Sequence, residues 1–94
     1  MKINLQSLHF KASDHLSQYV SDKVGKLSHI NGDIISAEVT LFSEDGKGIP
    51  RYYCEIRLNI PGHDDFVKKS ADQYEAAISE AVDALHEMLV RNKK

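Results

Sequence analysis

Few side chains in this sequence could do chemistry together. The single cluster of histidine and carboxylates is His63-Asp64-Asp65, and no further ligand follows it at a spacing typical of a zinc site. We interpret the cluster as a polar turn that leads into a strand. The alternative is a metal-dependent enzyme in which the fold brings other ligands to His63, Asp64 and Asp65.

The other candidates for catalysis are equally sparse. Cys54 is the single cysteine, and strand alternation places it on an apolar face, where a small buried side chain is expected rather than a nucleophile. The glycines of residues 45–48 lack the P-loop pattern that would cradle phosphates. We therefore predict that the protein is not an enzyme and uses no cofactor, metal or small-molecule substrate.

Basic side chains are the remaining candidates for a binding site. Lys23 falls among the apolar positions of a predicted helix, so its stem must cross the core edge and bring its ammonium out to water. Lys26 lies near the same edge. The other basic residues end a predicted strand or the last helix: Lys68, Lys69, Arg91, Lys93 and Lys94. They suit solubility and the helix dipole, or they form a split basic surface that grips a phosphate backbone.

The overall charge does not favour general nucleic-acid binding. The chain has 12 basic and 14 acidic residues, a formal net charge of −2, whereas a nucleic-acid-binding domain usually carries a basic excess. RNA binding would therefore need a local basic patch. Glu80, Asp83 and Glu87 line the outer face of the last helix, and they favour the alternative of a small protein-interaction module.

The length and composition indicate one domain, residues 1–94. Hydrophobic residues make up 41% of the 94 residues, which is enough for one small core. No apolar run approaches the roughly 20 residues that a membrane-spanning helix needs, and residues 1–10 lack the apolar region of a signal peptide. We expect a cytoplasmic protein, and the single cysteine agrees with a reducing compartment.

Hydrophobic periodicity predicts the element order β-α-β-β-β-α. Alternation predicts strands over residues 2–8, 34–42, 52–60 and 64–69, with Ile35 facing inward and a loop over residues 43–50. Helical spacing predicts one helix from an N-cap at Ser13 to about His29, and a second after capping-box candidates at Ser70 and Asp72.

These elements predict an α+β fold in two layers. One layer is a four-stranded, mostly antiparallel sheet with one face open to water, and both helices pack on the other face. The last helix contributes an apolar arc, and Ala77, Ala81 and Ala84 flank that arc as a smooth surface for the first helix. The arc consists of Tyr74, Ile78, Ala81, Val82, Leu85, Met88 and Leu89.

The chain resembles the ribosome hibernation-promoting factors, also called ribosome-associated inhibitor or sigma-54 modulation proteins. The resemblance covers essentially the whole length. It rests on the element order, the opening KINLQS, the segment YVSDKVGKL at 19–27 and the segment DQYEAAISEAVDAL at 72–85. This chain resembles the short form of the family, without the second dimerisation domain that many members carry.

The resemblance implies a fold related in shape to double-stranded-RNA-binding domains and a non-enzymatic function. It implies binding to the small ribosomal subunit and its rRNA, in the channel for tRNA and mRNA, so that translation stops and idle ribosomes are preserved. Lys23 and Lys26 match basic positions in the family's first helix, and Arg91 and Lys93 match basic positions late in its second helix. The family usually has further basic residues where this chain has Ala84 and Glu87.

Overall fold

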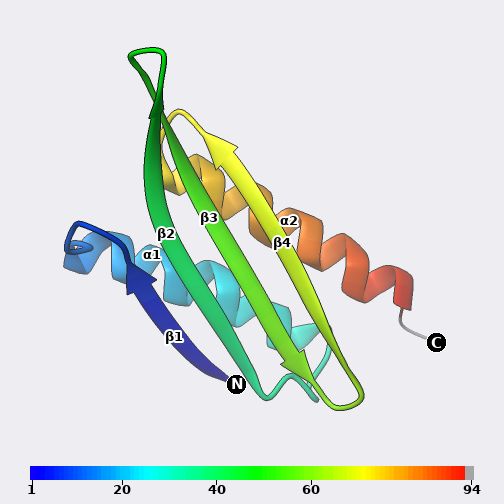
Figure 1. Cartoon of the computed structure of the whole chain (residues 1–94). Coiled ribbons are helices and arrows are strands. Elements are labelled where there is room, and N and C mark those ends of the chain that lie inside the picture. The colour runs from blue at the N-terminus through cyan, green and yellow to red at the C-terminus, as the bar shows by residue number, and fades with distance from the viewer. Residues whose placement is uncertain (93–94) are drawn as a thin grey trace.

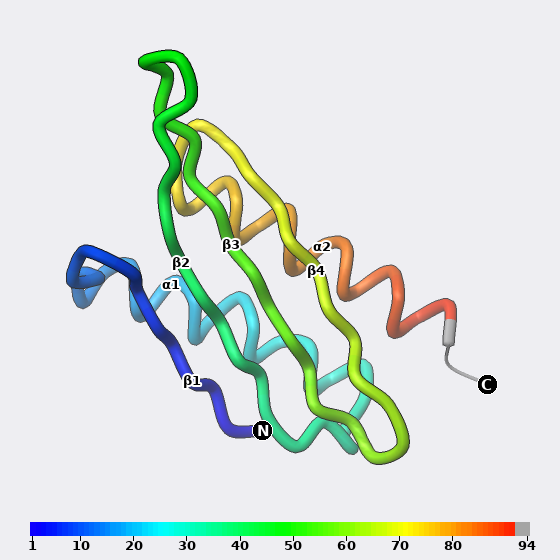
Figure 2. The backbone as a smooth tube through the Cα atoms, in the orientation of Figure 1, coloured from blue at the N-terminus to red at the C-terminus, as the bar shows by residue number. Residues whose placement is uncertain are grey.

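The chain folds into four strands and two long helices joined by short turns. A computed structural model describes residues 1–92 (Figures 1 and 2). The elements follow in the predicted order, with a short 3₁₀ helix, η1, after the first α-helix. They are β1 (Lys2–Ser7), α1 (Asp14–Gly25), η1 (Lys26–His29), β2 (Ser36–Gly46), β3 (Ile49–Ile60), β4 (His63–Ala71) and α2 (Tyr74–Asn92).

The four strands form one mixed sheet in the order β1-β2-β3-β4. β1 pairs with β2 in parallel, while the β2–β3 and β3–β4 pairs are antiparallel. A parallel pair needs a crossover between its strands, and α1 with η1 supplies it. The prediction of a mostly antiparallel sheet is confirmed, and the parallel edge follows from the helix inserted between the first two strands.

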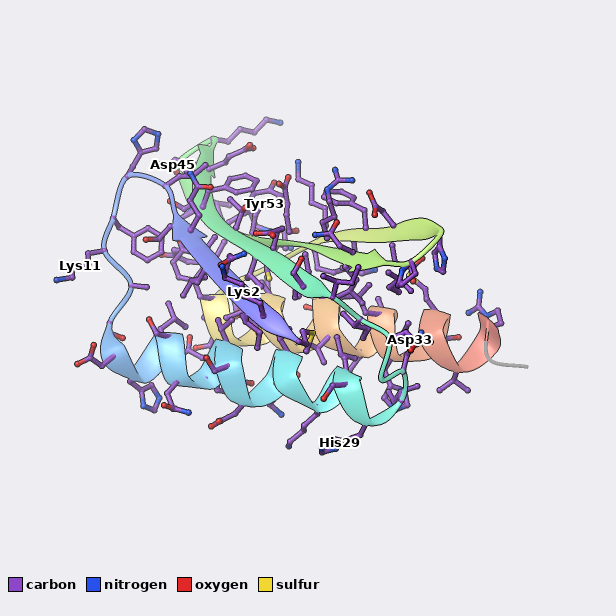
Figure 3. All side chains as sticks on the ribbon, turned by 90° about the horizontal axis from the view of Figure 1, so that it is seen from below. Lys2, Lys11, His29, Asp33, Asp45 and Tyr53 are labelled. Atoms are coloured by element: carbon purple, nitrogen blue, oxygen red, sulfur yellow. The ribbon has the colours of Figure 1, made fainter. Side chains whose placement is uncertain are left out.

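Both helices cover the same face of the sheet, as predicted. α1 contacts β1, α2 contacts β3 and β4, and the two helices contact each other. Seen nearly edge-on, the sheet lies on one side of the molecule and the helices lie on the other (Figure 3). The opposite face of the sheet carries no helix and is called the open face below.

One hydrophobic core lies between the two layers. Cys54, Ile56, Leu58 and Ile60 alternate along β3 and are all buried, as the pattern predicted. Across the interface, α2 buries most of its apolar arc together with the flanking Ala77, while Tyr74 and Met88 of the arc are partly buried. The largest side chains that are fully buried are Val20, Val24, Leu27, Val39, Leu41, Ile56, Leu58, Ile78 and Leu85.

The first helix begins where the sequence predicted. Ser13 accepts a hydrogen bond from the Leu16 backbone N–H on its side-chain oxygen, at 3.1 Å, and so caps one of the free amides at the helix start. The α-helix ends at Gly25, and the last predicted turn, up to His29, is 3₁₀ instead. Gly25 is therefore the last residue of α1.

Three predictions about strand and helix ends were wrong. Ser70 does not cap α2, because it lies in β4 and its hydroxyl accepts a hydrogen bond from Arg51 Nη2 at 3.1 Å. Ile35 is 61% exposed while Ile34 is buried, because the regular strand starts only at Ser36. The predicted loop over 43–50 is mostly strand.

The β2–β3 connection is a tight turn. Gly46 pairs with Ile49, so only Lys47 and Gly48 turn the chain, and both have positive φ, 58° and 77°. Two positive φ values in a two-residue loop are typical of a type I′ hairpin, which matches the twist of the strands. The result is a hairpin arm that projects beyond β1 and β4 (Figure 1).

Candidate RNA-binding surface

Lys23 and Lys26 come from the end of α1 and the start of η1. Lys23 is half-buried, and its ammonium lies 5.6 Å from the centroid of the Tyr19 ring, one turn earlier. This is the arrangement that the helical pattern required, with the stem packed along the core edge and the charge at the surface. Lys26 is exposed, so both charges are accessible to a ligand.

Arg91 is the basic side chain in the last turn of α2. Its Nη2 donates to Glu87 Oε1 at 2.9 Å, and both side chains are largely exposed. Exposed ion pairs one helical turn apart stabilise a helix by only about 0.3–0.5 kcal/mol. A phosphate can therefore compete for Arg91, but Glu87 lowers the positive potential there.

The two helices bring these residues to one end of the molecule. α1 and α2 run in the same general direction on the sheet, so that both finish at the same end of the helix layer (Figures 1 and 2). Lys23, Lys26 and Arg91 lie in the last turns or just after them. We call these three residues the helix-end patch. Basic side chains also offset the partial negative charge of a helix C-terminus.

Lys68 and Lys69 do not lie together. In the β3–β4 register Lys69 is opposite the buried Cys54, so it lies on the helix side of the sheet at its edge. Lys68 is opposite Glu55 and belongs to the open face. Consecutive residues of a strand point to opposite faces, and the two lysines therefore cannot serve one continuous surface. Lys93 and Lys94 lie outside the described residues.

The same alternation separates the candidate metal ligands. Asp64 lies on the open face, with Oδ2 3.6 Å from Arg57 Nη1. Asp65 is buried on the helix side, where its Oδ2 lies 3.7 Å from His63 Nε2. Within residues 1–92 no group of three metal-binding side chains comes together. The fold therefore does not bring to His63, Asp64 and Asp65, within that part of the chain, the other ligands that the alternative of a metal-dependent enzyme required.

Cys54 is buried in the core, as the strand pattern predicted. Burial, and to a lesser degree the charge of Glu55, raises the pKa of its thiol to about 12. The thiolate, which is the reactive form, is therefore scarce at physiological pH. This environment fits a core side chain and not a nucleophile.

Sequence reasoning did not find a group of aromatic and basic side chains on the open face. Phe42 and Tyr53, on neighbouring strands, stack with ring centroids 4.9 Å apart, and the Lys68 ammonium lies within 5.5 Å of both ring centroids. Phe42 and Tyr53 alternate with the buried residues of their strands, so the sequence could have predicted that both lie on the face away from the core. The pairing of these particular residues depends on the register between strands, which alternation alone does not give.

Comparison with known proteins places this geometry in a family. The model of the family described as sigma 54 modulation protein / S30EA ribosomal protein matches residues 3–94. No curated protein sequence matches. Within the described residues, no helix is long and apolar enough to cross a membrane.

Two solved structures share the fold over nearly the full length. The N-terminal domain of Protein Y from Thermus thermophilus has a TM-score of 0.84 and 26% identity, covering 99% of this chain and 100% of that one. A ribosomal subunit interface protein from Coxiella burnetii has a TM-score of 0.84 and 12% identity, covering 97% of this chain and 96% of that one. The family match and the shared fold together show that this chain belongs to the sigma 54 modulation / S30EA family of ribosome-associated proteins.

Proposed function

We propose that this protein binds the small ribosomal subunit and occludes the channel for tRNA and mRNA, so that translation stops and the idle ribosome is preserved. The protein acts as a folded plug and catalyses no reaction. The observation that carries the proposal is the helix-end patch, in which Lys23, Lys26 and Arg91 reach the same end of the helix layer in a chain that belongs to a ribosome-associated family.

The electrostatics of the chain support a local mode of binding. A net charge of −2 cannot draw the whole molecule toward RNA, so attraction must come from the side that carries the patch. The acidic outer face of α2, where Glu80 and Asp83 are exposed, disfavours approach along the length of that helix. RNA therefore approaches the molecule at the end of the helix layer. Lys69 at the sheet edge and Lys93 and Lys94 after α2 are further candidates for phosphate contacts.

The affinity for the small subunit should decrease as the salt concentration rises. If the protein contacts about four to six phosphates, the logarithm of its affinity falls with the logarithm of salt concentration by about 0.7–0.9 per contact. Binding that persists unchanged at high salt would not fit a surface made of exposed lysine and arginine side chains.

Co-sedimentation with separated ribosomal subunits tests the proposal. The protein should pellet with small subunits at low salt and not with large subunits alone, and added tRNA should compete with it. An absence of pelleting with small subunits at low salt would refute the proposal. Pelleting without any competition from tRNA would show that the protein binds the subunit outside the channel.

A protein-interaction module is the second candidate. It is favoured by one observation, the exposed acidic face of α2 with Glu80 and Asp83. This candidate predicts partners in a pull-down that survive nuclease treatment. Loss of all partners after nuclease treatment would leave RNA as the ligand.

A further inference from the structure

The open face of the sheet carries an ordered pair of aromatic rings. Phe42 on β2 and Tyr53 on β3 are directly opposite each other in the strand register. Their ring centroids are 4.9 Å apart and their planes differ by only 2°. Both side chains are half-buried, on the sheet face that no helix covers, and Tyr53 is seen there in Figure 3.

A cation on β4 lies close to both rings. The Lys68 ammonium on β4 lies 5.5 Å from the Phe42 centroid and 5.2 Å from the Tyr53 centroid. No carboxylate lies within ion-pair distance of Lys68 in the described residues. A cation held only by ring faces at an exposed site is bound weakly, so an anion can draw it away.

A second aromatic–cation pair lies further along the same face. The Arg57 guanidinium lies 5.2 Å from the centroid of Phe66, which is 46% exposed. Tyr53 and Arg57 are four residues apart on β3, roughly 13 Å at about 3.3 Å per residue. The two pairs are therefore far enough apart to contact different nucleotides of one strand.

We propose that Phe42, Tyr53 and Lys68, extended by Arg57 and Phe66, bind unpaired RNA on the open face by stacking bases on the rings. In this mode Lys68 moves from the rings to a phosphate while a base takes its place. The inference rests on the proposed function in that RNA is the ligand, but it assigns a second surface, on the side of the sheet opposite the helices.

The chemistry of the face favours single-stranded RNA over other ligands. In duplex RNA the base faces are stacked on one another, whereas unpaired bases are free to stack on aromatic side chains. A protein partner would favour a continuous apolar patch, but charged residues border these rings. Among them, Glu55 lies opposite Lys68, and Asp64 pairs with Arg57.

The same charges predict how this surface responds to salt. Because the acidic residues offset the basic ones, stacking and not phosphate attraction provides most of the binding. Loss of Lys68 should lower the salt slope by about 0.7, the value for one phosphate contact on a single strand. Loss of the rings should lower affinity at every salt concentration and leave the slope unchanged.

The test uses a fluorescently labelled RNA of about ten nucleotides without self-complementarity, free or annealed to its complement, and fluorescence anisotropy. Phe42→Leu/Tyr53→Leu should weaken binding of the single strand about tenfold or more, the effect of losing one stacked base. Tyr53→Phe keeps the ring and should bind like the wild type. Lys11→Gln, in the loop after β1, is the matched charge control for Lys68→Gln.

Three results would overturn the inference of RNA stacking on the open face. Single-strand affinity of Phe42→Leu/Tyr53→Leu within twofold of wild type, or an equal loss for single strand and duplex, overturns the inference. So does a ring variant that keeps its RNA affinity but loses a nuclease-resistant protein partner. Thermal unfolding monitored by circular dichroism checks that each variant is folded. If the double variant does not fold, Phe66→Leu on the edge strand β4 replaces it in the comparison of single-strand and duplex affinity. Co-sedimentation of wild-type protein with small subunits separates a failure of this inference from a failure of the proposed function.

Discussion

Arg91 and Glu87 form an ion pair across one turn at the end of α2, with Arg91 Nη2 2.9 Å from Glu87 Oε1. Both side chains are largely exposed, 69% and 73%. Glu87 therefore pairs with Arg91, which is the residue of α2 in the helix-end patch. The positive potential at this end of α2 is therefore partly neutralised.

Glu87→Gln should strengthen ribosome binding. The substitution releases Arg91 and removes a negative charge beside the expected phosphate path, which is worth about 0.5–1 kcal/mol, or roughly two- to fivefold in affinity at low salt. The measurement is co-sedimentation with small subunits over a range of protein concentrations. Glu80→Gln, which makes the same charge change nearer the start of α2, should give a smaller gain. Equal gains for the two variants would contradict a specific effect on Arg91.

Lys23→Glu/Lys26→Glu should weaken binding to the small subunit by at least about tenfold at low salt, because two contacts of about 1 kcal/mol are replaced by repulsion. The control is Lys11→Glu/Lys47→Glu, which changes the net charge equally. Those lysines lie in the β1–α1 loop and at the hairpin tip, away from the ends of the helices. If both double variants bind alike, the α1 end is not the contact surface.

Cys54 should resist thiol reagents in the folded protein. Its burial and its pKa of about 12 leave almost no accessible thiolate near neutral pH. Labelling with a chromogenic disulfide reagent should be slow in buffer and fast in denaturant. Rapid labelling in buffer, at a rate above that of global unfolding, would contradict the buried position.

The same thiol makes folding stability depend on alkaline pH. Because the pKa is higher in the folded state than its ordinary value of 9.0, the contribution is complete below about pH 9. It is lost as the pH rises from there toward 12, by up to about 1.4 kcal/mol per pH unit. Cys54→Val should remove this component. The measurement is the free energy of unfolding from denaturant titrations at a series of pH values. If the thiol made no contribution, this free energy would change with pH in the same way for the wild type and for Cys54→Val.

Gly48→Ala should destabilise the protein more than Gly46→Ala. Gly48 has φ +77° in the hairpin turn, whereas the other glycine lies in regular strand, and neither site has a neighbour that a methyl group would meet. An L-residue in the left-handed region costs about 1–2 kcal/mol. Denaturant midpoints of the two variants provide the comparison, and equal midpoints would show that the type I′ geometry is not the constraint.

Local signals in the sequence predicted most of the fold. Ser13 as a cap and the alternation of Cys54, Ile56 and Leu58 depend on near neighbours in the chain, and the structure confirms them. A connection was predicted over residues 43–50, but its tight turn at Lys47 was missed because a non-glycine residue with positive φ gives no pattern signal. Ser70 is a residue type that often caps helices, but here it pairs within the sheet as part of β4, where its hydroxyl accepts a hydrogen bond from Arg51.

The candidate site was only partly predictable for a different reason. The Arg91–Glu87 pair has the four-residue spacing that charge patterning recognises, so the sequence contained that signal. The opposite faces of Lys68 and Lys69 follow from strand alternation once β4 is assigned. The contact of Lys68 with Phe42 and Tyr53 joins three strands, however, and depends on register and twist that no single segment encodes.

Chemical probing of the small-subunit rRNA, with and without the protein at low salt, tests the central claim most directly. If the protein occludes the channel through its helix-end patch, the protected nucleotides should line the tRNA and mRNA path, and Lys23→Glu/Lys26→Glu should lose that protection. Protection confined to other parts of the subunit, or none at a concentration that saturates co-sedimentation, would contradict the claim.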